Sequence, residues 1–205
     1  MEIVLDVYKR IYNPLYPVVC MDESPKQLIA ETRLPIPASQ GKPARYDYEY
    51  ERCGMCNIFM ASEPLAEKRI VKITKRRTKQ DWSWFLKDIS RQYKNASKII
   101  LVMDNLNTHT PGALYETFQP EAAKSLLDRF EFVYTPKHGS WLNMAEIELN
   151  VLIRQCLGRR INNISVIRKE VLAWQKLRNN KNATINWQFT TEKAKKKLIR
   201  LYPTF

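Results

Sequence analysis

The chain has 205 residues, of which 44% are hydrophobic and 27% are charged, so it is long enough for one sizeable core and short for two. Its 34 Lys and Arg residues exceed its 21 Asp and Glu residues, and the net charge of +13 favours a polyanionic partner such as nucleic acid. The apolar runs are too short to span a membrane and the first residues lack a signal-peptide pattern, so we expect a bacterial-type cytoplasmic protein.

The first half of the sequence predicts a short helix, three strands and a longer helix. Helical character up to Tyr12 is broken by NPLYP, and PVVCM predicts a short strand. Residues 24–50 are rich in Pro, Lys and Gln, which indicates a long loop or a weak strand. CNIFMAS and KRIVKIT predict two strands joined by the turn EPLAE. Thr78 and Asp81 form a capping-box pattern, which predicts the start of an amphipathic helix that extends to Tyr93.

The second half predicts two more strands and several helices. KIILVM and FEFVYT are predicted as strands, and ALYETF, PEAAKSLLDRF and NMAEIELNVLIRQCL as helices. Two helices rich in Lys and Arg are predicted at residues 164–179 and 191–200. The order predicts an α/β fold for residues 1–160, with helices on both faces of a mixed five-stranded sheet. We expect residues 161–205 to form a basic helical C-terminal extension packed on the same domain.

Acidic residues follow two of the predicted strands. Asp22 ends the first strand and Asp104 ends KIILVM, and in an open α/β sheet functional groups gather at strand ends. A third acid, Glu146, has two interpretations. It can complete a capping box with Asn143, or it can continue the inner face of its helix. That inner face is predicted from an apolar stripe of Leu149, Leu152, Ile153 and Cys156.

A carboxylate on an inner helix face is costly to bury unless a cation compensates it, and either a lysine or a divalent metal can do so. Asp22, Asp104 and Glu146 together would form an oxygen-rich site for hard cations such as Mg²⁺. Two such ions, about 4 Å apart, activate a nucleophile and stabilise the leaving oxygen of a phosphodiester. Basic side chains around the site would hold the DNA backbone.

Basic residues before the second helix are candidates for DNA contacts. Lys75, Arg76, Arg77 and Lys79 lead into a helix N-terminus, and both features favour phosphate. The alternative is an exposed, solvated loop.

Polar residues after the second acid also have two interpretations. Asn105, Asn107 and His109 can position DNA or the attacking water, or they can cap the helix that begins near Pro111.

His138 and Trp141 precede the third acid. His138 can contact DNA or help to position the residues that bind the metal, and it can equally lie in a surface loop. Trp141 can stack on an unpaired base or pack under its loop. Cys53 and Cys56 have zinc-knuckle spacing but no second ligand pair, so we expect small residues in or near a hairpin and no zinc.

Three blocks of the sequence resemble the catalytic core of DDE transposases. They are VVCMDES, LVMDNLNTHTP and YTPKHGSWLNMAEIEL, in this order and with compatible spacing, because residues 105–145 separate Asp104 from Glu146. The most similar branch is the bacterial insertion-sequence six-thirty family of the mariner superfamily. FMASEPLAEKR, ITKRRTKQDW and NWQFTTEKAKKKLIRLYP extend the resemblance over nearly the whole chain. LNMAE aligns with the family signature Leu-Asn-x-x-Glu, which selects Glu146 over Glu148.

This resemblance implies a ribonuclease-H-like fold and cut-and-paste transposition. Asp22 would bridge two Mg²⁺ or Mn²⁺ ions, Asp104 and Glu146 would each hold one, and Glu23 would be secondary. The DNA partners would be the terminal inverted repeats of the element and a target, usually at a TA step. The protein would act as a homodimer at the bacterial nucleoid.

Two other functions remain as alternatives. One is a ribonuclease-H-like nuclease or junction resolvase, since that fold hosts several phosphodiester chemistries. The other is a non-catalytic, DNA-binding remnant of a mobile element. The family resemblance also implies helix-turn-helix domains ahead of the core, for which residues 1–15 have no room. We therefore expect a chain that is incomplete as a transposase and binds DNA weakly and without sequence preference.

Overall fold

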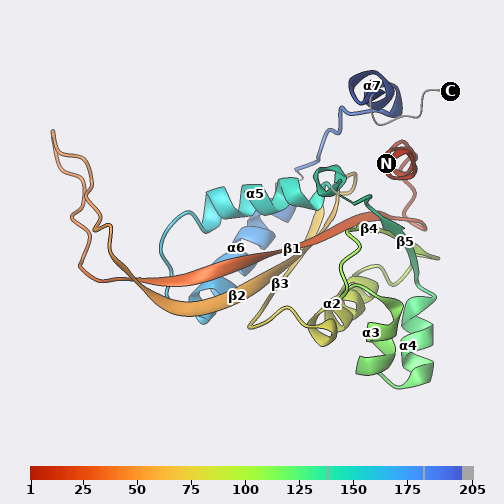
Figure 1. The fold of residues 1–205 in the computed structure, drawn as a ribbon, viewed down its shortest axis with the longest axis horizontal. Coiled ribbons are helices and arrows are strands. Elements are labelled where there is room, and N and C mark those ends of the chain that lie inside the picture. Colours follow the sequence, from red (N-terminus) through yellow and green to blue (C-terminus); the bar gives the residue numbers. More distant parts are fainter. Residues whose placement is uncertain (138, 182, 200–205) are drawn as a thin grey trace.

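The computed structural model describes residues 1–137, 139–181 and 183–199 (Figure 1). The elements in chain order are α1 (Glu2–Tyr8), β1 (Val18–Glu31), β2 (Tyr50–Glu63), β3 (Lys68–Thr74), α2 (Lys79–Gln92), β4 (Ile99–Met103), α3 (Pro111–Thr117), α4 (Pro120–Leu127), β5 (Phe130–Tyr134), a short 3₁₀ turn η1 (Ser140–Leu142), α5 (Ala145–Cys156), α6 (Ile164–Asn180) and α7 (Thr191–Lys197). None of the helices in the described ranges is long and apolar enough to cross a membrane.

The strands form one mixed sheet, as predicted. Its order is β3-β2-β1-β4-β5. The pairs β1–β2 and β2–β3 are antiparallel, whereas β4 lies parallel to both β1 and β5. The parallel half is the more buried, because helices cover β4 on both faces and all of its residues are buried.

Helices cover both faces of the sheet (Figure 1). On one face, α2, α3 and α4 pack over the largest core cluster, to which α2 contributes Trp82, Phe85, Leu86 and Ile89. On the other face, α5 and α6 pack over β2 and β3, while α1, α7 and the start of α5 cover β1, β4 and β5. The predicted capping box is present at the start of α2, where Thr78 and Asp81 each accept from the other's backbone N–H.

The strand β1 is much longer than the sequence indicated. The region 24–50, predicted as a loop or weak strand, contains the second half of β1 and the start of β2, paired with each other as far as Glu31 and Tyr50. These two half-strands form an arm that extends away from the body of the domain (Figure 1). The β2 half of the arm is exposed as far as Met55, and the β1 half is partly buried at most positions with Leu28 in the core, so the arm lacks the apolar alternation by which a half-buried strand is recognised. Cys53 and Cys56 lie in this hairpin, the first exposed and the second buried.

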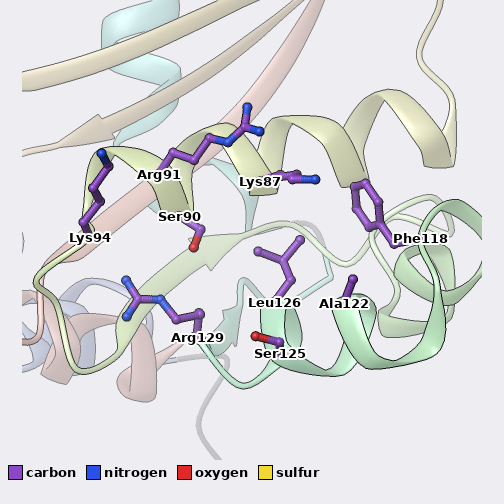
Figure 2. A pocket seen from close by; sticks show the side chains of 9 residues that line it. All are labelled: Lys87, Ser90, Arg91, Lys94, Phe118, Ala122, Ser125, Leu126 and Arg129. Carbon is purple, nitrogen blue, oxygen red and sulfur yellow. The ribbon is translucent and has the colours of Figure 1, made fainter.

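Two helices on the first face leave a cavity between them. It has a volume of about 430 Å³ and lies between the C-terminal half of α2 and the helix α4 (Figure 2). Its lining residues are Lys87, Ser90, Arg91, Lys94, Phe118, Ala122, Ser125, Leu126 and Arg129.

Candidate active site

The site lies where two parallel strands part. The pairing of β1 with β4 ends at Cys20 and Val102. Asp22 and Asp104 are each two residues beyond this pair, so the register places them at the same level of the sheet. The prediction that the first strand ends at Asp22 is wrong. The strand continues because β2 still pairs with it there, through Met60 opposite Asp22, while β4 stops at Met103.

Neighbouring acids on β1 point to opposite faces of the sheet. Cys20 belongs to the core cluster under α1 and α5, and Met21 belongs to the cluster under α2. Since side chains alternate along a strand, Asp22 lies on the α5 side and Glu23 on the α2 side. The adjacent pair Asp22-Glu23 therefore serves two different environments.

An asparagine fixes the start of α5 beside β1. The Nδ2 amide of Asn143 donates to the carbonyl oxygen of Met21 at 2.7 Å, and its Oδ1 accepts from the backbone N–H of Ala145 at 3.2 Å. The capping box between Asn143 and Glu146 is not what the structure shows, since Met144 occupies the N-cap position of α5 and makes no side-chain capping bond. Asn143 instead connects the residue before Asp22 to the turn that carries Glu146.

The carboxyl group of Asp22 is in a crowded, largely buried position. Burial raises its pKa, and repulsion from Glu23, Asp104 and Glu146 adds to the effect, so that the pKa is about 7. A hydrogen bond from the backbone N–H of Glu23 to Asp22 Oδ1, at 2.8 Å, favours the ionised form but does not offset the burial. The acids selected from the sequence thus act on one another electrostatically.

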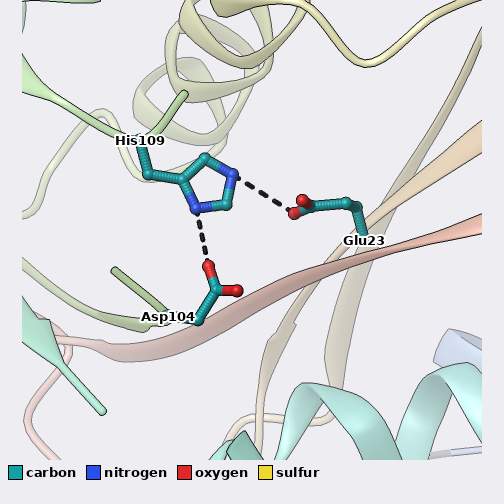
Figure 3. Close-up of side chains that lie close together, drawn as sticks. All are labelled: Glu23, Asp104 and His109. Carbon is teal, nitrogen blue, oxygen red and sulfur yellow. Dashed lines mark hydrogen bonds and ion pairs between the residues drawn. The ribbon is translucent and has the colours of Figure 1, made fainter. Parts of the chain in front are cut away.

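A buried histidine connects two of the acids (Figure 3). His109 Nδ1 lies 2.7 Å from Asp104 Oδ1, and His109 Nε2 lies 3.2 Å from Glu23 Oε2. The ring stacks on Trp82 of α2, with centroids 5.6 Å apart. Ligand atoms of Glu23, Asp104 and His109 all lie within 4.8 Å of one another.

The two acids beside this histidine raise its pKa. Burial alone would lower the pKa of His109, but the interactions with Asp104 and Glu23 outweigh burial and raise the pKa to about 9. An imidazolium ring has a proton on each nitrogen and no lone pair for a metal. His109 compensates the charge of Glu23 and Asp104, and with them it forms a group of described side chains whose ligand atoms lie close enough together to hold a metal ion.

Among the described residues, Asp22, Asp104 and Glu146 do not together form a group whose ligand atoms all lie within 4.8 Å of one another, but their side chains are of the kind that binds a divalent metal. Carboxylate oxygens are the ligands that Mg²⁺ and Mn²⁺ prefer. On the α5 side the crowding around Asp22 is strong enough to raise its pKa to about 7, which indicates negative charge that a cation would neutralise. Asp22, Asp104 and Glu146 are the donors available to it.

The basic loop after β3 borders the same site. Arg77 NH1 lies 3.1 Å from Glu23 Oε1, and Lys75 and Arg76 are exposed beside it. These three residues line a cavity of about 390 Å³ together with Pro25, Met55, Cys56 and Asn57. Lys79, in the first turn of α2, points elsewhere and pairs with Glu116 at 2.6 Å.

Other residues selected from the sequence lie apart from the acids. Asn105 and Asn107 are exposed, and α3 begins after Thr110, which makes no side-chain capping bond within the described ranges. Trp141 is 45% exposed and meets Phe189 edge to face at 5.4 Å, so only part of it packs under the loop. His138 lies outside the described residues.

The inner face of α5 is confirmed at Leu149 and Leu152, but the prediction that Glu146 continues it is wrong. Its buried residues are Ala145, Glu148, Leu149 and Leu152, whereas Glu146 is partly exposed. Glu148 is the buried acid, with Arg69 NH2 at 2.9 Å and Arg178 NH2 at 3.1 Å from its Oε1. Arg69, the second residue of the strand KRIVKIT, was the sequence signal for such a partner. Glu146 is therefore free to face the other acids.

These features define a mixed-sheet α/β domain with acids at a parting pair of strands, the architecture of ribonuclease-H-like enzymes. The family model for the DDE superfamily endonuclease matches residues 17–168, and the chain belongs to this family. Among curated proteins, none matches the chain.

Solved structures of Mos1 transposase share the fold. The Mos1 mariner paired-end complex with Mn is 17% identical, with a TM-score of 0.58 over 88% of this chain and 54% of that chain. The Mos1 paired-end complex with the left transposon end is 18% identical, with a TM-score of 0.56 over 85% of this chain and 52% of that chain. The Mos1 strand transfer complex is also 18% identical, with a TM-score of 0.53 over 85% and 51%. The chain thus spans about half the length of these transposases.

Proposed function

We propose that this domain is the catalytic part of a DNA transposase, which cuts DNA at the ends of a mobile element and joins the free 3′-hydroxyls to target DNA. The observation that carries the proposal is the crowding of Asp22 by Asp104 and Glu146 at the fork between β1 and β4. The family match and the fold shared with transposases that were solved with transposon-end DNA support it.

In this proposal Asp22, Asp104 and Glu146 hold two divalent cations, Mg²⁺ or Mn²⁺, with Asp22 between them. Bound at the acids, such cations would lower the pKa of the attacking water or hydroxyl and stabilise the leaving oxygen. His109 holds Asp104 by a hydrogen bond of 2.7 Å and so limits its rotation. Glu23 takes no cation. It stays paired with His109 and Arg77.

The DNA backbone would pass over the basic loop. Lys75 and Arg76 are exposed beside the site. The ion pair with Glu23 holds the positive charge of Arg77 at the edge of the acidic residues. Lys79 would contribute less, since Glu116 neutralises it. Trp141 and His138 precede α5 on the chain and would contact the strand that enters from that side.

The motif blocks extend the proposal beyond the catalytic step. Their resemblance supports membership of the insertion-sequence six-thirty branch as a further part of the proposal, with TA as target, a homodimer as the active form and the bacterial nucleoid as its location. They also favour residues 161–205 as an extension of one catalytic domain.

The test is a strand-transfer assay with duplexes made from the inverted repeats that flank the gene, with Mg²⁺ or Mn²⁺ and a target plasmid. We expect nicked ends and joined products, both lost on Asp22→Asn or Glu146→Gln. Cut ends without joined products would show a plain nuclease. Binding without metal-dependent cutting by the complete protein would show a remnant.

A further inference from the structure

The cavity between α2 and α4 is lined by positive charge. Lys87 and Arg91 lie on α2 at the spacing i, i+4, Lys94 follows in the turn after the helix, and Arg129 comes from the residues after α4. Figure 2 shows Ser90 and Leu126 pointing into the space between the helices, whereas the side chains of Arg91 and Lys94 extend along its rim, away from α4. None of the described residues that line this cavity is acidic.

Packing explains only part of this charge. A helix stripe at this spacing beside another helix is normally apolar, because it faces the core. Arg129 has a structural task, since its guanidinium donates to the carbonyl oxygens of Tyr93 and Ala96, both at 2.6 Å. Two residues near the end of α2 also gain from the negative end of the helix dipole. That gain amounts to fractions of a kcal/mol at exposed positions and does not require a cavity.

Local acids do not neutralise the stripe. Asp88 lies 3.7 Å from Arg91, but its other oxygen accepts from Lys72 at 2.6 Å. Lys87 lies 4.9 Å above the ring of Trp84 and 4.9 Å above that of Phe118, contacts that leave its charge uncompensated. The cavity therefore keeps a surplus of positive charge, with two serine hydroxyls as further donors.

We propose that this cleft binds the phosphodiester backbone of DNA, at a second contact on the same duplex that enters the active site. The helix α2 joins the two places, because Trp82 in its first turn stacks on His109 and Arg91 lies in its last turn, nine residues later. At about 1.5 Å per residue this is roughly 14 Å, the length of about four base pairs at about 3.4 Å each. The proposal rests on the proposed function in taking DNA as the substrate.

An aromatic surface adjoins the cleft. Trp84 is 42% exposed and meets Phe118 edge to face at 5.0 Å. Basic side chains next to a half-exposed aromatic pair suit the phosphates and sugars of a nucleic acid better than they suit an isolated small anion. This favours a backbone segment as the occupant.

The experiment compares two triple variants of the full chain by fluorescence anisotropy with a duplex of about 20 base pairs, without divalent metal, over a range of salt. The test variant combines Lys87→Gln, Arg91→Gln and Lys94→Gln, and it spares Arg129 because of its structural bonds. The control combines Lys195→Gln, Lys196→Gln and Lys197→Gln, which removes the same formal charge from exposed residues of α7 on the other face of the sheet. Circular dichroism establishes that both variants are folded.

We expect the slope of log K against log salt to fall by about 0.9 for each phosphate that the test variant no longer neutralises, and to stay unchanged in the control. Equal slopes for the two variants would overturn the proposal. The two sources of phosphate are distinguished by following the NMR chemical shifts of the backbone amides of Ser90 and Ser125 during titrations with the duplex and with inorganic phosphate. Shifts that appear only with the duplex support a backbone site, and equal shifts with inorganic phosphate overturn it. Equal competition by polyglutamate of the same charge would also overturn it. Because no cutting is measured, a failed transposition assay leaves these results interpretable.

Discussion

The side chain of Asn143 donates a hydrogen bond to the carbonyl of Met21 at 2.7 Å, with both groups buried. This bond crosses from the turn before α5 to the residue that precedes Asp22, so the helix of Glu146 and the strand of Asp22 are held together by one amide.

Asn143→Ala should lower the free energy of unfolding by about 1–3 kcal/mol, because it leaves the Met21 carbonyl buried without a partner. Cleavage should fall further than this stability loss explains, since the start of α5 is released from β1. Urea unfolding measures the first effect and single-turnover cutting the second. Asn150→Ala, at an exposed position of the same helix, should change stability by less than about 0.5 kcal/mol.

Two glutamates on α5 should behave in opposite ways. Glu148→Ala leaves Arg69 buried and unpaired and should destabilise the fold by about 3–5 kcal/mol. Glu146→Gln should leave the unfolding free energy within about 0.5 kcal/mol and abolish cutting. Thermal unfolding of both variants, with a nicking assay, checks the pair. A stable Glu148→Ala protein would contradict the buried network.

Asp104→Asn should abolish cleavage and leave DNA binding largely intact. The change removes an anionic oxygen that a divalent metal needs but keeps the basic surface that contacts phosphates. We expect a loss of cutting greater than about 100-fold, beyond the usual effect of residues that only support metal ligands. Asp128→Asn, at an exposed acid paired with Lys124, serves as the control. Gel-shift and nicking assays run in parallel would refute a metal role if binding fell as much as cleavage.

His109→Gln should destabilise the protein by about 3 kcal/mol, because Glu23 and Asp104 lose the cation between them. This loss of unfolding free energy is small for a broken buried ion pair, because the Asp104 side chain is 26% exposed and remains partly solvated. Millimolar Mg²⁺ should recover part of it by compensating the same charge. Urea titrations with and without Mg²⁺ measure both effects, and Asn107→Ala, exposed in the same loop, should show neither.

Glu63→Gln should stabilise the protein at neutral pH. Burial at the end of β2 raises the pKa of Glu63 above its ordinary value of 4.5, although a hydrogen bond with Tyr93 and the charge of Lys68 oppose the shift. A raised pKa means that the folded state disfavours the ionised form, so the wild-type protein loses stability as pH rises through about 4.5 and above. The variant lacks this cost. Denaturation at pH 4 and pH 7 should show the gain only at the higher pH, and a gain that is equal at both would exclude ionisation as its cause.

Much of the body of the fold could be predicted from sequence because its elements have strong local signals. The strands KRIVKIT and KIILVM are apolar runs, and the capping box at Thr78 and Asp81 marks the start of α2 by chemistry confined to four residues. The long arm of β1 and β2 could not be predicted in this way. Its pairing satisfies backbone groups but buries few side chains, Leu28 and Cys56 among them, and such pairing leaves little pattern in a single sequence.

The site shows the same division. Asp22 and Asp104 could be selected because each follows a run of buried residues. The contact of His109 with Glu23 depends on the path of the loop after β4, and the spacing of apolar residues in a sequence does not predict the path of a loop. The exchange of Glu148 for Glu146 on the inner face of α5 arose from a shift in helical phase, which a sequence with two glutamates in one turn leaves open.

The end of the pairing between β1 and β4 also divides β1 into a part whose length is constrained and a part whose length can change. Up to the last pair, Cys20 with Val102, both strands are fixed by neighbours on each side. Beyond it, β1 pairs with β2, and the backbone N–H of Ile29 also donates to the carbonyl oxygen of Ile161. Lengthening, shortening or replacing residues 32–49, which connect β1 to β2, should therefore change how far the arm extends without changing the position of Asp22. Related chains can acquire new reach through this arm while the spacing of their acids is inherited intact.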